Sequence, residues 1–216
     1  MGRSTLFAAR KGESSNAAEQ ERSQTELNIR YSLLLIIAFL TQTPANNLVK
    51  NGSFDRDLSG WTLGSGEWAL DELTHSGAAK VLNPRYLGRL TGVAADSFGI
   101  WQCVKIDKNQ EYELQFRSRM SEDFAKLGYG GAALTWFSNS NCSIHPKQFA
   151  GGIVGSARVK LPVSDGRWHE LALTPGRPPR TAHSVEVRLE SWSTDFENKR
   201  PIEVWFDDIV FRAVNK

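Results

Sequence analysis

The side chains of this sequence that are best suited to chemistry lie in segments where apolar and polar residues alternate. In SVEVRLESW (184–192), the valines and Leu189 share one parity, whereas the glutamates, Arg188 and Trp192 share the other. Successive side chains of a β-strand point to opposite faces, so the apolar parity predicts the core side and the polar parity the outer side. Trp192 is therefore expected to lie outside, beside two carboxylates and a guanidinium.

The same reasoning extends this outer set to the stretches WQCVKI, EYELQFRSRM and GGAALTWF. The expected outer residues are Trp101, Gln115, Arg117, Arg119, Thr135, Phe137, Arg188, Glu190 and Trp192. An indole covers the weakly polar face of a sugar ring, while guanidinium, carboxylate and amide groups bind its hydroxyls. All members except Thr135 are candidate sugar-binding residues, with Trp192 as the first aromatic platform. The alternative is that charged residues simply cover a solvated sheet. Arg117 and Arg119 can reach the same ligand as Trp192 only if their strands belong to the same sheet.

A catalytic constellation is not recognisable. Carboxylates occur at Glu111, Glu113, Glu186 and Glu190, but solvent exposure alone would explain each of these alternating polar rows. The four histidines are scattered, without the spacing of a zinc site or a nucleophile motif. We expect a non-catalytic binding domain. The alternatives are a glycoside hydrolase or polysaccharide lyase on a jelly-roll fold, and a protein-interaction module of the cell surface.

The elements that carry these residues are expected to be strands. From residue 46 onward, short alternating segments are separated by turn residues, and no helical period is sustained. The predicted strands cover residues 60–63, 67–70, 78–82, 98–106, 111–120, 131–137, 167–173, 184–192 and 202–214. So many strands without intervening helices predict an all-β fold, a two-sheet antiparallel β-sandwich of the jelly-roll kind.

The first 45 residues differ in composition from this part. Residues 1–30 are polar and of mixed charge, which predicts disorder because little apolar surface is available for burial. A basic residue, an apolar run and small residues follow in the order of a secretory signal. Residues 31–45 are therefore predicted to be a signal segment, with cleavage near Ala45. The run is shorter than the roughly 20 residues of a spanning helix, although a membrane-proximal anchor or a buried helix would look similar. The folded domain is expected over 46–216, secreted, periplasmic or at the cell surface.

The only two cysteines, Cys103 and Cys142, lie in this expected domain. Two thiols in an exported chain, without a CxxC pair, predict a single disulfide. In a cytosolic protein they would instead be buried thiols. The formal net charge of +2 gives no strong field for nucleic acid, so we expect a monomer that binds a polysaccharide or oligosaccharide, without nucleic acid and without a stable transmembrane span.

Several stretches together resemble one known family. They are NLVKNGSFDRDLSGW (47–61), HSGAAKVLN (75–83), WQCVKIDKNQEYELQFRSR (101–119), Trp168 at the start of a strand, and the closing VWFDDIVF (204–211). In this order they are similar to a CenC-type carbohydrate-binding module of the galactose-binding jelly-roll superfamily. The resemblance implies a module that binds glycans in a cleft or on a face of the sandwich and often holds a structural calcium ion.

The resemblance also implies a role for the opening stretch. Its NGSF portion would form the first turn and strand, and the acidic residue after Phe would join an Asp of the last strand at the calcium site. The matching positions here are Asp55 and Asp207, with Asp208 as neighbour. Oxygen ligands of this kind suit calcium. Parity with Trp205 and Ile209 favours Asp207 over Asp208 as the inward ligand, whereas strand capping or pairing with a nearby cation is the alternative.

Overall fold

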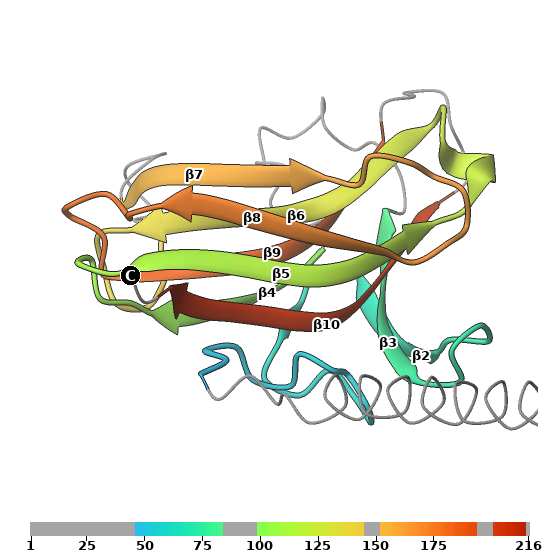
Figure 1. The fold of residues 1–216 in the computed structure, drawn as a ribbon, viewed down its shortest axis with the longest axis horizontal. Helices are drawn as coiled ribbons and strands as arrows, with labels where there is room; N and C mark the ends of the chain where they lie inside the picture. Colours follow the sequence, from blue (N-terminus) through green and yellow to red (C-terminus); the bar gives the residue numbers. More distant parts are fainter. Residues whose placement is uncertain (1–45, 84–98, 145–151, 194–200, 215–216) are drawn as a thin grey trace, which may run out of the picture. The chain divides into compact units, whose positions relative to one another are not determined.

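The computed structural model describes residues 46–83, 99–144, 152–193 and 201–214. They form two five-stranded antiparallel sheets (Figure 1). The first sheet has the strand order β1 (Thr62–Leu63), β4 (Gly99–Lys105), β9 (Ser184–Ser193), β6 (Gly128–Phe137) and β7 (Ile153–Lys160). The second has the order β2 (Gly66–Leu70), β3 (Gly77–Asn83), β10 (Ile202–Val214), β5 (Glu111–Met120) and β8 (His169–Gly176). The predicted all-β jelly-roll sandwich is confirmed.

Among the described residues, the helical structure is one short 3-10 turn, η1 (Glu122–Phe124). No helix in this part of the chain is long and apolar enough to cross a bilayer. The predicted disordered lead, signal segment and cleavage position near Ala45 lie outside the described residues.

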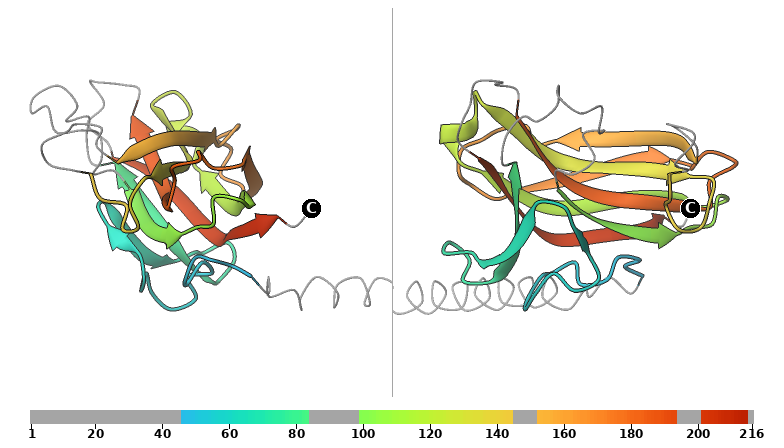
Figure 2. Two further views of the ribbon diagram at one scale, coloured as in Figure 1. Left: turned by 90° about the vertical axis from the view of Figure 1, so that its left-hand side faces the viewer. Right: turned by 180° about the vertical axis from the view of Figure 1, so that it is seen from behind.

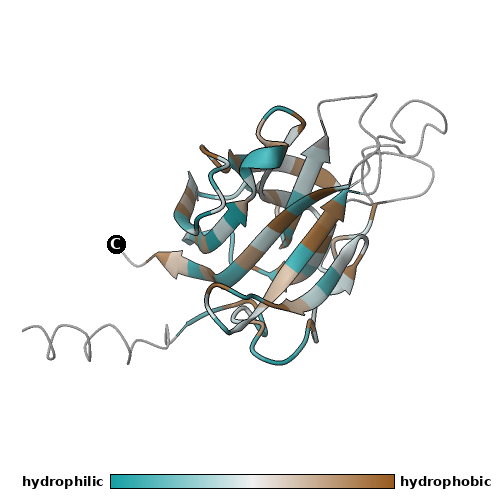
Figure 3. Ribbon diagram, turned by 90° about the vertical axis from the view of Figure 1, so that its right-hand side faces the viewer, coloured by the Kyte–Doolittle hydropathy of each residue, from teal (hydrophilic) through white to brown (hydrophobic). Residues whose placement is uncertain are grey.

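The core lies between the sheets and follows the predicted alternation. In β5, Tyr112, Leu114 and Phe116 are buried, and in β9 the side chains of Val187 and Leu189 are fully buried. Figure 3 shows the resulting succession of hydrophilic and hydrophobic residues along the strands. Burial of one apolar face per sheet is the main stabilising contribution in such a sandwich.

The stretch 47–61 closes one edge of the sandwich without forming a strand, which corrects the expected first strand. It runs beside β10, as the blue segment in Figures 1 and 2 shows, and the N–H of Ile209 donates to the carbonyl of Gly52 at 2.8 Å. A Cβ on Gly52 would lie 2.1 Å from the Ile209 carbonyl oxygen, so the close approach requires glycine. Phe54 and Trp61 pack against each other with ring centroids 5.4 Å apart, and both are buried. The turn therefore delivers two aromatic rings to the core.

One strand of the structure, β7, has no counterpart among the predicted strands. It pairs with β6 at the end of the first sheet, with Arg158 opposite Ala133 and Lys160 opposite Gly131. Its sequence IVGSARVK contains the small residues Gly155, Ser156 and Ala157 at its centre, so the apolar alternation that identifies a strand is weak. This strand contributes two cations to the outer face of the first sheet.

Candidate functional site

The register of the first sheet aligns one row of side chains across four strands. Trp101 of β4 lies opposite Arg188 of β9, Arg188 lies opposite Ala133 of β6, and Ala133 lies opposite Arg158 of β7. All four belong to the parity that points away from the core. The outward positions predicted for Trp101 and Arg188 are confirmed, and both side chains are half-buried.

A groove of about 130 Å³ follows this face. It is lined by Ala133, Thr135, Phe137, Cys142, Ile144, Ile153, Arg158, Glu186, Arg188, Glu190 and Trp192. Phe137 of β6 lies opposite Ile153 of β7 toward the apolar end of this lining, to which Ile144 and the disulfide-bonded Cys142 also belong. Arg158 and Glu190 lie toward the other end of the same strands, which is polar. The groove therefore combines apolar and charged contacts within one small space.

The two groove carboxylates are buried, which corrects their expected exposure to solvent. Glu190 is only 1% exposed, and its Oε1 lies 2.5 Å from Nε of Arg158. Glu186 accepts a hydrogen bond from Nε of Arg188 at 2.8 Å and is also buried. Burial raises the pKa of Glu190 above its ordinary value, although the positive charge of Arg158 opposes the shift. Each carboxylate thus fixes one guanidinium in position.

Two aromatic side chains lie together at the polar end of the first sheet. Trp192 and Tyr129 occupy opposed positions of β9 and β6, and their rings stack with centroids 6.3 Å apart. Trp192 is half-buried on the outer face, as predicted. Tyr129 was missed because the predicted strand began at residue 131, three residues after the start of β6 at Gly128; the sequence signal was the tyrosine directly before the Gly-Gly pair.

Phe137 also points outward from its sheet, but its ring is only 2% exposed. The segment after β6 carries Cys142, which forms a disulfide with Cys103 of β4 across a Cα separation of 5.9 Å. The predicted disulfide is confirmed. Because Phe137 is buried at the apolar end of the groove, it shapes the groove and does not offer an open ring face to a ligand.

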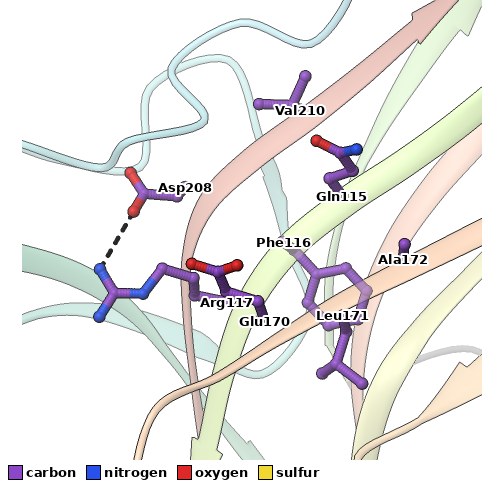
Figure 4. A pocket seen from close by; sticks show the side chains of 8 residues that line it. All are labelled: Gln115, Phe116, Arg117, Glu170, Leu171, Ala172, Asp208 and Val210. Carbon is purple, nitrogen blue, oxygen red and sulfur yellow. Dashed lines mark hydrogen bonds and ion pairs between the residues drawn. The ribbon is translucent and has the colours of Figure 1, made fainter. Parts of the chain in front are cut away.

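The remaining predicted binding residues lie on the other sheet. Gln115, Arg117 and Arg119 belong to β5, whereas Trp192 and Arg188 belong to β9. The condition for a single patch, that these strands share a sheet, is therefore not met; alternation assigns a side of one strand but not the sheet to which the strand belongs. Gln115 and Arg117 line a separate depression of about 390 Å³ together with Glu170 and Asp208 (Figure 4).

Both β5 arginines already have partners within the fold. Arg117 forms an ion pair with Asp208 at 3.2 Å, drawn in Figure 4. Arg119 forms an ion pair with the fully buried Asp71, and its guanidinium lies 4.5 Å from the ring centroid of Trp205. These contacts hold the outer layer of the second sheet together. Both arginines accordingly contribute to the structure of that face, and their role in sugar binding stays a prediction.

The three predicted calcium ligands approach one another at β10. The pKa of Asp207 is raised to about 7, mainly because its carboxyl group is buried. The negative charges of Asp208 and Asp55 also raise it. A β-bulge between Asp207 and Val210 breaks the alternation, so Trp205 points outward while Ile209 points into the core. The parity argument for Asp207 was therefore wrong, although Asp207 is the buried member and Asp208 is exposed.

The donor set at this cluster is incomplete from side chains alone. Among the described residues, no three His, Cys, Asp or Glu side chains are grouped as metal ligands. A calcium ion at Asp55 and Asp207 would also need carbonyl, hydroxyl or water oxygens, which calcium readily accepts. The negative charge and the raised pKa of Asp207 fit a cation at this position.

The sequence matches no family model and no curated protein. Among solved structures, it is similar to the enzymatically active domain of tailspike protein 4 of bacteriophage CBA120 (TM-score 0.53, 16% identity, 80% of this chain and 22% of that one). It is also similar to the CBM22-1 and GH10 modules of Clostridium thermocellum endo-1,4-β-D-xylanase 10B, complexed with xylohexaose (TM-score 0.51, 15% identity, 78% and 28%). A third structure is a candidate sugar-binding protein from Bacteroides thetaiotaomicron (TM-score 0.50, 11% identity, 78% and 100%).

These similarities support the fold. The chain spans about a quarter of the first two proteins, at 22% and 28% of their length, and all of the third. At these identities the common feature is the jelly-roll sandwich, which hosts many unrelated functions. The function has to be argued from the groove.

Proposed function

We propose that this protein is a non-catalytic carbohydrate-binding module that binds a polysaccharide or oligosaccharide in the groove of the first sheet. The observation that carries the proposal is the row of fixed guanidinium groups beside the half-buried Trp192. Arg158 and Arg188 are each held by a buried carboxylate, so their N–H groups are oriented before a ligand arrives. Preorganised polar groups next to an aromatic ring suit a sugar, which presents hydroxyls around an apolar ring face.

The pairing of the carboxylates argues against a glycosidase. A glycosidase needs two carboxyl groups that face each other across the scissile bond, and at least one of them gives up or takes a proton. Glu186 and Glu190 are both buried, and each is paired with a different arginine. Binding therefore accounts for the groove better than hydrolysis.

Three further properties belong to this proposal. Membership of the CenC-type group is part of this proposal; the resemblance of the stretches between residues 47 and 211 carries it, and the similarity in fold to the CBM22-1 and GH10 modules complexed with xylohexaose agrees with it. A structural calcium ion that ties the N-terminal turn to β10 is also proposed, on the negative charges of Asp55 and Asp208 that act on the buried Asp207 and with oxygen ligands beyond these carboxylates. The signal-like segment before residue 46 supports secretion, and the disulfide is consistent with an oxidising compartment.

Binding is tested with the expected mature domain on a glycan array, followed by calorimetry on the glycan retained most strongly. Trp192→Ala should weaken binding by about 1–3 kcal/mol, the range for loss of an aromatic anchor, with an unchanged far-UV spectrum. Trp68→Ala is the matched control, because Trp68 is 40% exposed on β2 of the other sheet. It should leave binding unchanged.

Two results would contradict the proposal. Equal affinity of the Trp192→Ala variant and the unchanged domain would show that the groove is not the sugar site. Retention of no array member, together with a protein partner recovered by the domain and lost on Trp192→Ala, would favour a protein-interaction module.

A further inference from the structure

Three half-buried aromatic rings lie on the outer face of the first sheet, among the residues that the structure describes, and each has a cation beside it. The guanidinium of Arg188 lies 4.8 Å from the ring centroid of Trp101, and that of Arg158 lies 5.0 Å from Trp192. Nζ of Lys160 lies 4.0 Å from the ring of Tyr129. A ligand that approaches one of these rings therefore meets a positive charge at the same time.

The charges on this face are unequal. Among its described outward residues, the carboxylates are Glu186 and Glu190, whereas the cations are Lys105, Arg158, Lys160 and Arg188. Both carboxylates are paired with arginines inside the groove. Lys160 takes part in none of the ion pairs seen among the described residues, and its contact is the ring of Tyr129. The face therefore has an excess of positive charge.

The opposite face of the sandwich differs. Lys80 of β3 lies within 3.4 Å of both Glu67 and Glu203, and Arg117 and Arg212 also have carboxylate partners. Its cations are therefore neutralised locally. The positive excess belongs to the face that carries the groove and does not follow from the overall charge of the chain.

We propose that the sugar bound in the groove is anionic, a glycan whose rings carry carboxylate or sulfate groups. This inference rests on the proposed function and specifies its ligand. Arg158 lies against Trp192 and Lys160 lies against Tyr129, and both cations come from β7 two residues apart, so an anionic substituent of a ring bound at this pair has two cations within its reach. A charged substituent gains from these contacts, whereas a neutral ring gains only the aromatic contact and hydroxyl hydrogen bonds.

The test compares glycans that differ only in charge. Calorimetry at pH 7 and low salt is run with tetragalacturonate and with its methyl ester, which has the same rings without the carboxylates. A second pair, dextran sulfate and dextran, distinguishes sulfate from carboxylate. The expected result is tighter binding of the charged member of at least one pair, with an affinity that falls as salt rises from about 0.05 to 0.5 M because exposed charges are screened.

The residue test uses Lys160→Gln, with Lys108→Gln as the matched control. Lys108 lies in the exposed turn between β4 and β5, so its replacement changes the net charge equally without touching the groove face. Lys160→Gln should weaken binding of the preferred charged glycan about two- to fivefold, the effect of losing one partly exposed charge contact. The uncharged glycan of the same pair should bind to both variants with the affinity that it has for the unchanged domain.

The outcomes separate this inference from the proposed function. If neutral glycans bind through Trp192 and charged glycans bind with no higher affinity, the anionic ligand is excluded and the carbohydrate-binding function stands. If Lys160→Gln and Lys108→Gln have the same effect on the charged glycan, the assignment to this cluster is wrong. If no array member binds, charged or neutral, both proposals fail.

Discussion

Replacement of Asp71 by Ala should destabilise the second sheet more than any other single loss of a charge there. Asp71 is fully buried between β2 and β3, and it forms an ion pair with Arg119. Its Oδ2 also accepts hydrogen bonds from Nε1 of Trp168 at 3.0 Å and from the hydroxyl of Thr74 at 2.8 Å. Although burial acts to raise the pKa of Asp71, these hydrogen bonds and the charge of Arg119 lower it below the ordinary value. The carboxylate is therefore held ionised.

The expected loss in the free energy of unfolding follows from the groups that Asp71→Ala leaves without a partner. The side chain of Arg119 is 17% exposed, so its charge would be poorly solvated, and the indole N–H of Trp168 would lose its acceptor. Breaking a buried ion pair from one side costs about 3–5 kcal/mol. Because Arg119 keeps some access to water, we expect about 3 kcal/mol, or a fall in melting temperature of about 6–12 °C for a domain of this length.

The assay is thermal and urea unfolding at pH 7, followed by circular dichroism. Asp165→Ala is the control, since Asp165 is exposed and its loss should change the free energy of unfolding by no more than about 0.5 kcal/mol. The double variant Asp71→Ala with Arg119→Met should recover part of the loss, because the unpaired cation is removed. Since the folded pKa of Asp71 is depressed, its contribution is present above about pH 4 and is lost as pH falls below that value. A loss for Asp71→Ala no larger than for the control would refute the argument.

Three other predictions concern the remaining features of the domain. In excess chelator, the free energy of unfolding should decline as pH rises from about 4 to about 7. The pKa of Asp207 is raised to about 7 in the folded state, so ionisation of this carboxyl group costs more in the folded than in the unfolded chain. Asp207→Asn should abolish the decline. Calcium should raise the melting temperature, and a melting curve that chelator leaves unchanged would exclude the site. Replacing both Cys103 and Cys142 by Ser should lower the free energy of unfolding, measured in urea, by about 4 kcal/mol for a cross-link over 39 residues. Protein from the extracytoplasmic fraction should begin near residue 46, and an intact N-terminus there would contradict export.

The fold could be predicted where one face of a strand is consistently apolar. The segment EYELQFRSRM has this pattern, and its predicted bounds are those of β5. β7 could not be predicted in the same way, because it lies at the end of its sheet and its central residues are small. The alternation is also interrupted, since the pairing of β7 with β6 shifts register between Trp136 and Phe137. A local pattern identifies a strand only when burial constrains every second residue.

The candidate site was predictable only in part, for a related reason. Parity correctly placed Trp101, Arg188 and Trp192 outside, but the order of strands in the sheets depends on pairing between distant segments. That order separates Arg117 from Trp192, and it brings Arg158 of the missed strand against Glu190. Burial of Glu190 could therefore not be foreseen from its own strand.

The small residues of β6 explain why the groove lies on this face. Ala133 is opposite both Arg188 and Arg158, and Gly131 is opposite both Glu190 and Lys160. A Cβ on Gly131 would lie 2.2 Å from the carbonyl oxygen of Val159, so the backbone of β7 packs against a position of β6 that has no room for a side chain. With so little side-chain volume between them, charged groups of β7 reach those of β9 across the central strand. The ion pair between Arg158 and Glu190 depends on this arrangement, and the proposed ligand would reach the cations beside the Tyr129–Trp192 pair through the same gap.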